Sequence, residues 1–342
     1  MPASPAAPLS EARPQGGAAT RRGVLLARGS ALLVLCIWTS FILVARGSSR
    51  ATLLPYDIAF LRFACSGLLV LPFAWVWRAA LVRGLSEGAA PAEAGRVAFG
   101  RAVALALTGG FGYGLLAYGG FFLAPAAHAA VLLPGSLPLW SALGALWLLG
   151  ERLTAARVCG LALILAGGAA IAGRSFAEAF EGAATWRGDL LFIGASMSWA
   201  LYGVWCRRWR VGALPATAAI ALVTLLLGVP AHAAAVAAGL VPSRLAEAGW
   251  GEIAFQAIYQ GGLAMVVAGC AYTQVVAHYG PVRTTMFTAI VPPLAALAAV
   301  PVLGEPLAAT ALLGLACVTL GLLVGNGVVR LPRRRLGSDA AR

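Results

Sequence analysis

The chain has 342 residues, of which 61% are hydrophobic and 11% charged, and its mean hydropathy is +0.86. This composition excludes a water-soluble domain of this size and predicts a protein of the lipid bilayer. The net charge of +13 comes from arginine alone. The arginines lie at the ends of apolar runs rather than in one stripe with aromatic residues between them, which argues against nucleic-acid binding.

Apolar runs of about 18 to 25 residues divide the chain into membrane segments. Residues 1–22 have no apolar period and predict a disordered cytoplasmic tail, and residues 330–342 predict a basic one. The connections at 78–100 and 174–188 are too short for a separate soluble domain. Ten spanning helices are predicted, near residues 29–45, 56–77, 101–123, 127–149, 153–173, 189–206, 214–238, 254–278, 282–303 and 307–328.

Counting arginines on alternate sides of these ten helices predicts the orientation. Nineteen of the 25 arginines fall on the side of the two termini, five fall on the other side, and Arg62 lies inside a helix. Because cytoplasmic segments collect arginine, both termini are predicted to be cytoplasmic, in a multi-pass protein of the cell inner membrane. Much of the acid falls in the predicted outer segments, at Glu178, Glu181, Asp189, Glu247 and Glu252.

A five-residue pattern occurs twice, 154 positions apart. Residues 149–153 read Leu-Gly-Glu-Arg-Leu and residues 303–307 read Leu-Gly-Glu-Pro-Leu, and each follows one apolar run and opens another. Such an internal match indicates a duplication. Five helices is an odd number, so the second copy enters the membrane in the opposite orientation. We therefore predict an all-α integral membrane protein with ten transmembrane helices as two inverted five-helix repeats, an architecture typical of transporters. Further matches at this offset are Ala117 with Ala271, Tyr118 with Tyr272, Pro138 with Pro292, Leu143 with Leu297, Gly160 with Gly314 and Gly173 with Gly327.

Four local motifs carry a family resemblance. They are Trp38-Thr39-Ser40 in the first helix, Arg62 in the second, residues 134–138 (Pro-Gly-Ser-Leu-Pro) running into 149–151, and residues 291–293 (Val-Pro-Pro) running into 303–305. In this combination the chain resembles the EamA family of the drug/metabolite transporter superfamily, with repeats at 24–173 and 188–329. In the second repeat Trp199 stands where Trp38 stands in the first.

The resemblance implies a secondary carrier, often a proton-driven exporter of amino acids, other metabolites or drugs. Family members often have Gly-Ser-Asn after the first Trp, whereas Thr39-Ser40-Phe41 stands here, so an amino-acid substrate does not carry over. An uncoupled facilitator and an importer of the same fold stay open as alternatives, and an intramembrane enzyme is a weaker one. The partners predicted are a small-molecule substrate and lipid; protons and a second copy in a homodimer are left open.

Arg62 is the charged residue placed deepest in a predicted helix. An arginine at a helix centre costs about 2.5 to 3.5 kcal/mol on insertion scales and is usually retained for a reason. Helix two starts at the outer side near Pro55, so Arg62 lies roughly 10 Å in, at 1.5 Å per residue. Two readings stay open: a structural side chain that reaches back to the interface, or one that binds an anionic substrate group or gates the path. Asp57 lies about 140° round the helix and is not expected to pair with it.

Glu151 and Glu305 are candidates for proton coupling, since a carboxylate beside lipid can relay protons. The alternative is a loop and capping role at the N-terminal end of the following helix, where the helix dipole favours negative charge and Pro306 suits a first turn. Both interpretations stay open.

Helix eight gathers Gln256, Tyr259 and Gln260 on one face, which is expected to point into the bundle, either for interhelical hydrogen bonding or to line a cavity. Aromatic residues of helices one, three and six form a second set of candidates for the wall of a central cavity. They are Trp38, Tyr113, Tyr118, Trp199 and Tyr202.

No metal site and no cofactor are predicted. The six cysteines lie inside apolar runs without C-x-x-C spacing, and His128, His232 and His278 are far apart in the chain.

Overall fold

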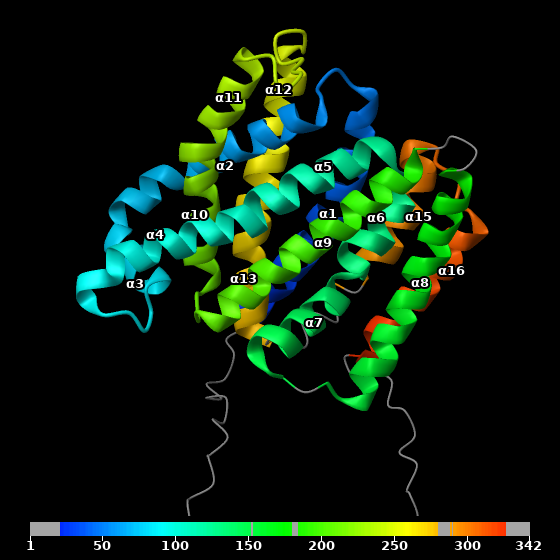
Figure 1. Ribbon diagram of the computed structural model, residues 1–342, viewed down its shortest axis with the longest axis horizontal. Helices are drawn as coiled ribbons and strands as arrows, with labels where there is room; N and C mark the ends of the chain where they lie inside the picture. The colour runs from blue at the N-terminus through cyan, green and yellow to red at the C-terminus, as the bar shows by residue number, and fades with distance from the viewer. Residues whose placement is uncertain (1–20, 152, 180–183, 280–287, 289, 326–342) are drawn as a thin grey trace, which may run out of the picture.

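The computed structural model describes residues 21–151, 153–179, 184–279, 288 and 290–325. Within these residues all regular structure is helical (Figure 1). The elements of the first part of the chain are α1 (Arg21–Gly47), η1 (Ser48–Arg50), α2 (Pro55–Val76), α3 (Arg78–Leu85), η2 (Pro91–Glu93), α4 (Ala94–Leu105), η3 (Ala106–Gly112), α5 (Tyr113–Leu123), α6 (Ala126–Ala130), η4 (Val131–Gly135), α7 (Leu137–Leu149) and α8 (Ala155–Ala179). Those of the second part are α9 (Thr185–Arg208), α10 (Ala213–Val223), η5 (Thr224–Gly228), α11 (Val229–Ala237), α12 (Trp250–Gln256), η6 (Ala257–Val267), α13 (Ala268–Tyr279), α15 (Val291–Leu303) and α16 (Ala309–Gly325).

Eight of these helices or continuous helical runs are long and apolar enough to cross a membrane. They are Gly23–Arg50, Pro55–Val76, Pro91–Leu123, Ala126–Leu149, Ala155–Gly173, Thr185–Arg208, Ala213–Ala237 and Trp250–Val275. The ninth and tenth predicted helices fall on the shorter apolar helices α15 and α16, of 13 and 17 residues, and most of residues 282–290 lies outside the described part of the chain.

Three predicted boundaries differ from the structure. The predicted connection at 174–188 is partly helical, because α8 continues to Ala179 and α9 begins at Thr185. The helix α1 begins at Arg21, inside the segment predicted as a tail, of which residues 1–20 lie outside the described part. The predicted connection at 78–100 is largely helical, because α3 occupies Arg78–Leu85 and α4 starts at Ala94. The latter two segments are short and carry arginine, so an apolar run does not reveal them, yet arginine is a good helix former.

Four of the spans contain π-helical turns, at η3, η4, η5 and η6. Such turns free backbone groups from the regular ladder and are frequent at functional sites. Two of them, η3 and η6, lie in the third and eighth predicted helices, which the sequence repeat pairs with each other.

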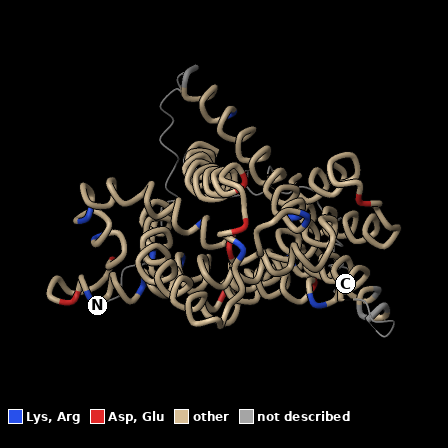
Figure 2. The backbone as a smooth tube through the Cα atoms, turned by 90° about the horizontal axis from the view of Figure 1, so that it is seen from above, with Lys and Arg blue, Asp and Glu red and all other residues tan. Residues whose placement is uncertain are grey.

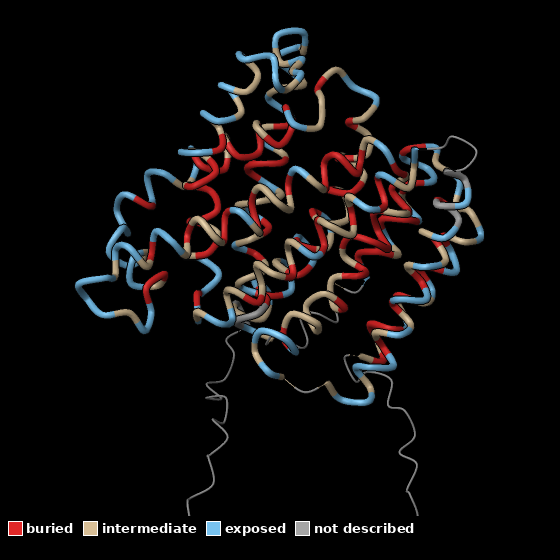
Figure 3. Tube along the Cα trace, viewed as in Figure 1, coloured by how far each residue is buried: buried red, intermediate tan, exposed pale blue. Residues whose placement is uncertain are grey.

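Large apolar side chains cover the outward faces of the bundle. Trp75, Trp147 and Trp250 are 73%, 76% and 86% exposed, and exposed leucines line the same surfaces. Figure 3 shows buried residues where helices face one another and exposed residues on the outside, while Figure 2 shows long stretches of helix without charged residues. Water would penalise so large an apolar surface, so lipid is its natural surrounding.

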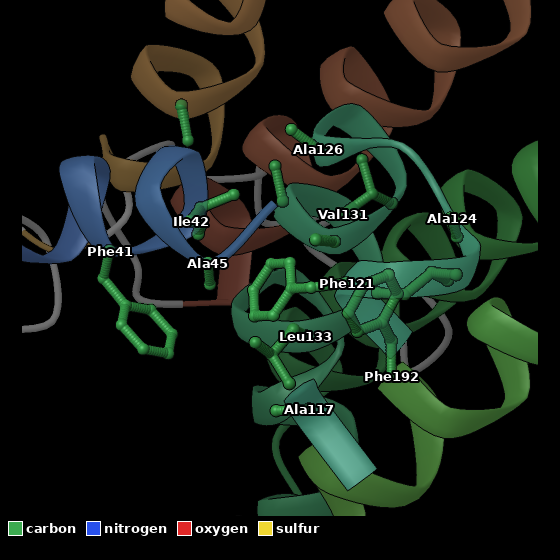
Figure 4. Close-up of a cluster of buried hydrophobic side chains, with 14 of the residues drawn as sticks. Phe41, Ile42, Ala45, Ala117, Phe121, Ala124, Ala126, Val131, Leu133 and Phe192 are labelled. Atoms are coloured by element: carbon green, nitrogen blue, oxygen red, sulfur yellow. The ribbon is translucent and has the colours of Figure 1, made fainter. Parts of the chain in front are cut away.

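The main core lies where α1, α5, α6 and α9 meet (Figure 4). The ring of Phe121 lies between those of Phe41 and Phe192, at centroid distances of 5.7 and 5.1 Å. Small residues such as Ala45 and Ala124 fill the remaining space and are fully buried. This packing joins α1 and α5 of the first repeat to α9 of the second.

The helices α8 and α16 pack closely through glycines. A Cβ added to Gly160 would lie 2.5 Å from the carbonyl oxygen of Gly321, and one added to Gly314 would lie 2.8 Å from that of Gly167. Early residues of α8 thus meet late residues of α16, so the two helices are antiparallel. Such close backbone approach through small residues is a common mode of helix packing in membranes.

Candidate functional site

A chain of buried hydrogen bonds crosses the interior from α5 to η1. Tyr118 Oη donates to Gln260 Oε1 over 2.9 Å, Gln260 Nε2 donates to Gln256 Oε1 over 3.2 Å, and Gln256 Nε2 donates to Ser48 Oγ over 2.7 Å. All four side chains are buried. The face of helix eight predicted from Gln256 and Gln260 therefore points into the bundle. The hydrogen bonds of this face join three helical segments, and such interhelical hydrogen bonds are favoured in apolar surroundings.

Arg62 lies beside this chain. Its side chain is buried, with 9% of the residue exposed, and Nη1 donates to the carbonyl oxygen of Gln260 over a long 3.4 Å. The guanidinium also lies 5.6 Å from the centre of the Phe41 ring. Within the described residues no ion pair includes Arg62, and Asp57, as expected, binds elsewhere, accepting hydrogen bonds from Leu54 N, Ser243 Oγ and Arg244 N. Arg62 is thus a buried cation that uses few of its five donors.

Three of the five aromatic candidates are joined by ring contacts. Trp199 has ring contacts with Tyr113 and Tyr202 at centroid distances of 4.9 Å each. Trp38 instead stacks on Tyr272 at 5.2 Å. Tyr259 shares a hydrogen bond of 2.6 Å with Ser40 of α1. Ser40, Ser48 and Tyr272 were missed as site candidates. Ser48 carries no local signal, whereas Ser40 stands in the first family motif and Tyr272 matches Tyr118 in the repeat, which could have pointed to them.

Glu151 and Glu305 both form ion pairs. Glu305 accepts a hydrogen bond from Arg46 Nε at 2.5 Å and from the backbone N–H of Ala126 at 2.8 Å, while Glu151 pairs with Arg207. The first pair is mostly buried, with 20% and 11% of the two side chains exposed, and the second is open, at 54% and 36%.

The capping interpretation of these glutamates is wrong. The following helices start at Ala155 and Ala309, four residues beyond each glutamate, so Pro306 precedes its helix. Each glutamate instead follows a glycine in the left-handed conformation, Gly150 (φ 68°) or Gly304 (φ 67°), that ends the preceding helix. Because this turn ends the helix and changes the direction of the chain, the following carboxylate can contact a residue on another helix.

The two ion pairs lie at opposite ends of one span. Glu305 binds the first residue of the helical run Ala126–Leu149, and Glu151 follows its last. A run of 24 residues extends about 36 Å. We call these two ends of the bundle the Glu305 end and the Glu151 end.

Two histidines also lie close to aspartates at the Glu305 end. His128 Nδ1 and Asp189 Oδ1 are 2.9 Å apart, and His232 Nε2 lies 4.0 Å from Asp57 Oδ1. Asp189, predicted in an outer segment, is on α9 and fully buried. Local sequence could not reveal these pairs, since their members are far apart in the chain. Within the described part of the chain no group of three or more His, Cys, Asp or Glu side chains gathers as metal ligands would.

A cavity of about 160 Å³ lies beside His128, away from the candidate residues of helices three and eight. Its lining includes three hydroxyl side chains, Ser175, Thr185 and Thr310.

These features define an all-helical, multi-pass membrane protein whose interior is joined by polar contacts between distant helices. The model of the EamA-like transporter family matches residues 21–173 and again 186–326, and the chain belongs to this family. The chain is similar to the "Uncharacterized transporter YyaM" of Bacillus subtilis (strain 168), with 26% identity over 244 residues, covering 70% of this chain and 77% of that protein. A solved structure titled only "Crystal structure of protein" matches with a TM-score of 0.56 and 20% identity, over 91% of this chain and 99% of that one, which supports the fold alone. The protein is therefore a membrane transporter of the drug/metabolite type.

Proposed function

We propose that the protein is a secondary transporter that exports small metabolites by alternating access between two inverted five-helix halves. The observation that carries this proposal is the reciprocity of the contacts between the halves. The match of Trp38 with Trp199 places Arg46 opposite Arg207, at an offset of 161. Arg46 of the first half binds Glu305 of the second, and Arg207 of the second half binds Glu151 of the first. Each pair is the image of the other.

The packing of the fifth helices follows the same rule. The repeat offset of 154 carries Gly160 onto Gly314 and Gly167 onto Gly321. Applying this offset to the contact between Gly160 and Gly321 gives a contact between Gly314 and Gly167, and both contacts are present. Likewise α1 packs on α13 and α15, and α9 packs on α5 and α7. A twofold axis across the bundle accounts for all of these pairs, and such an axis would let the halves exchange conformations.

The two ion pairs differ in a way that suits a carrier in one of its two states. By the arginine count the Glu305 end faces outward and the Glu151 end faces the cytoplasm. The buried Arg46–Glu305 pair then closes the outer end, while the more exposed Arg207–Glu151 pair borders the inner end. In a carrier that works by alternating access, the ion pair that closes one end is expected to be buried while the equivalent pair at the other end is exposed.

Arg62 is our candidate for the site that selects the substrate. A buried cation that has a long hydrogen bond to a backbone carbonyl, the Tyr118 phenol nearby and no ion pair among the described side chains is costly in a bilayer, and a bound anionic group would offset that cost. The phenols of Tyr113 and Tyr118 and the amides of Gln256 and Gln260 would surround such a group with neutral hydrogen-bonding partners. We therefore propose substrates that carry a carboxylate or a similar anionic group, with Trp38, Trp199, Tyr202 and Tyr259 contributing aromatic surface.

Efflux and growth protection in cells overproducing the protein test this function. The panel contains amino acids, their toxic analogues, nucleobases and cationic drugs, with empty-vector cells and an uncoupler as controls. Protection confined to carboxylate-bearing compounds and abolished by the uncoupler is expected. If the uncoupler has no effect, a facilitator replaces the coupled exporter; if accumulation rises instead, the protein imports.

The Arg62 site has its own matched control. Arg62→Gln should abolish protection at normal protein abundance, Arg62→Lys should retain part of it, and Arg50→Gln, at an exposed arginine of η1, should retain all of it. Normal transport by Arg62→Gln would remove Arg62 from the substrate site.

A further inference from the structure

The strongest group outside the proposed substrate site is the pair formed by His128 and Asp189. Asp189 is fully buried, its Oδ1 lies 2.9 Å from His128 Nδ1, and its Oδ2 has no hydrogen-bond partner among the described residues. A carboxylate offers about four acceptor positions, so this one is poorly satisfied. A buried ionised carboxylate of this kind is unstable unless a positive charge or a proton accompanies it.

The backbone brings the pair together by close packing. Gly188 lies against the connection between α5 and α6, where an added Cβ would be 2.6 Å from Ala124 Cβ and 2.9 Å from Ala124 N. This approach sets Asp189, on the first turns of α9, against His128 in the short helix α6. The pair therefore bridges a helix of the first repeat and a helix of the second.

Total charge decides which form of the pair is stable. With a neutral imidazole the buried pair carries one negative charge, whereas with an imidazolium the two charges cancel. Since burial disfavours net charge, the form with an imidazolium is the less costly of the two to bury.

The neighbouring charged side chains that the structure describes have contacts of their own. On neighbouring elements, Arg46 of α1 and Glu305 after α15 bind each other. Arg187 of α9 lies over the ring of Trp186. On α8, Arg174 and Glu178 have side chains outside the described part of the structure. His128 also lines the cavity of about 160 Å³, together with Ser175, Thr185 and Thr310. The volume of this cavity and the hydroxyl groups of its lining suit bound water, which would carry a proton to or from the pair.

We propose that His128 and Asp189 form a proton-binding site whose protonation holds α6 against α9 and keeps the Glu305 end closed. Loss of the proton removes the ionic part of the contact and leaves a buried negative charge, which favours separation of the two helices. That this change biases alternating access rests on the transport function proposed above; the proton binding itself does not. Of the acidic candidates, Glu151 and Glu305 already have arginine partners, so Asp189 replaces them as our coupling carboxylate.

Nitrogen NMR of the histidine side chains in the full-length protein in lipid nanodiscs tests the proton site without any substrate. The chain has three histidines, so His232→Gln with His278→Gln leaves His128 as the single reporter. We expect His128 to bind its proton more weakly after Asp189→Asn, because that change removes the buried negative charge 2.9 Å from its Nδ1. Unchanged titration in Asp189→Asn would overturn the proposal.

A second measurement covers the case in which Asp189→Asn does not fold. A cysteine at Ala127, which is buried at the Glu305 end, is labelled with a membrane-impermeant maleimide across the pH range in a background without native cysteines. Labelling corrected for thiolate content should become faster as pH rises, and His128→Gln, whose amide can still donate to Asp189, should remove this dependence. Persistence of the dependence in His128→Gln would contradict the proposal. If no compound in the substrate panel is transported, the transport function fails but the two proton-site measurements still stand. If efflux is sensitive to the uncoupler while the His128 titration is unchanged in Asp189→Asn, transport is coupled to a proton bound at another site.

Discussion

Removing the charge of Glu305 should loosen one end of the bundle far more than removing the charge of its counterpart Glu151. Both changes, Glu305→Gln and Glu151→Gln, break an ion pair with an arginine of the other repeat. Breaking a buried pair costs about 3–5 kcal/mol. Because Arg46 and Glu305 keep 20% and 11% exposure, we expect about 2 kcal/mol, or about 30-fold in the equilibrium between closed and open states.

The Glu151 pair provides the matched control. Its side chains are 54% and 36% exposed, and exposed pairs contribute at most about 1 kcal/mol, or about fivefold. The assay is the labelling rate of a cysteine at Ala127 by an impermeant maleimide, with a cysteine at Ala145, buried near the Glu151 end, as the reverse probe. Glu305→Gln should raise the rate at position 127 about 30-fold and Glu151→Gln at most about fivefold. Equal effects of the two variants would refute the reasoning.

Two further predictions concern the packing and the interior hydrogen bonds. Gly160→Ala places a Cβ 2.5 Å from the carbonyl oxygen of Gly321 and should destabilise the protein by about 1–3 kcal/mol, lowering its melting temperature in detergent, whereas Gly173→Ala, with open space around the added Cβ, should not. An unchanged melting temperature in Gly160→Ala would show that α8 and α16 are not packed as described. Tyr118→Phe leaves Gln260 Oε1 without its donor and should cost about 1–3 kcal/mol of unfolding free energy, and Gln260→Leu, which also removes the donor to Gln256 Oε1, should cost less in the Tyr118→Phe background than in the original chain. Strict additivity of the two changes would argue that their hydrogen bond contributes nothing.

The spans could be predicted because lipid imposes a simple length and composition rule on them. The face of Gln256 and Gln260 could be placed in the interior for the same reason, since lipid penalises exposed polar groups, whereas the sequence left open whether Arg62 reaches back to the interface. The helical part of 78–100 escaped this rule because it is neither long nor apolar enough to be recognised as a span.

Partners could not be predicted, because they depend on which helices meet. Arg46 and Glu305 are 259 residues apart, and His128 and Asp189 are 61 apart. A glutamate after Leu-Gly looks locally like a helix cap, and only the left-handed turn at Gly304 redirects it to α1. The repeat supplies the missing constraint, since pairing Trp38 with Trp199 makes Arg207 and Glu151 the image of Arg46 and Glu305.

The central claim is that the two ends open in alternation. Pulsed electron-spin distance measurements in nanodiscs test it most directly, with one pair of spin labels at Arg50 and Arg187 near the Glu305 end and another at Trp147 and Arg210 near the Glu151 end, all exposed positions. Glu305→Gln should shift the first pair to longer distances and the second to shorter ones. Both pairs lengthening together, or the second pair staying unchanged while the first lengthens, would contradict alternating access between two inverted halves.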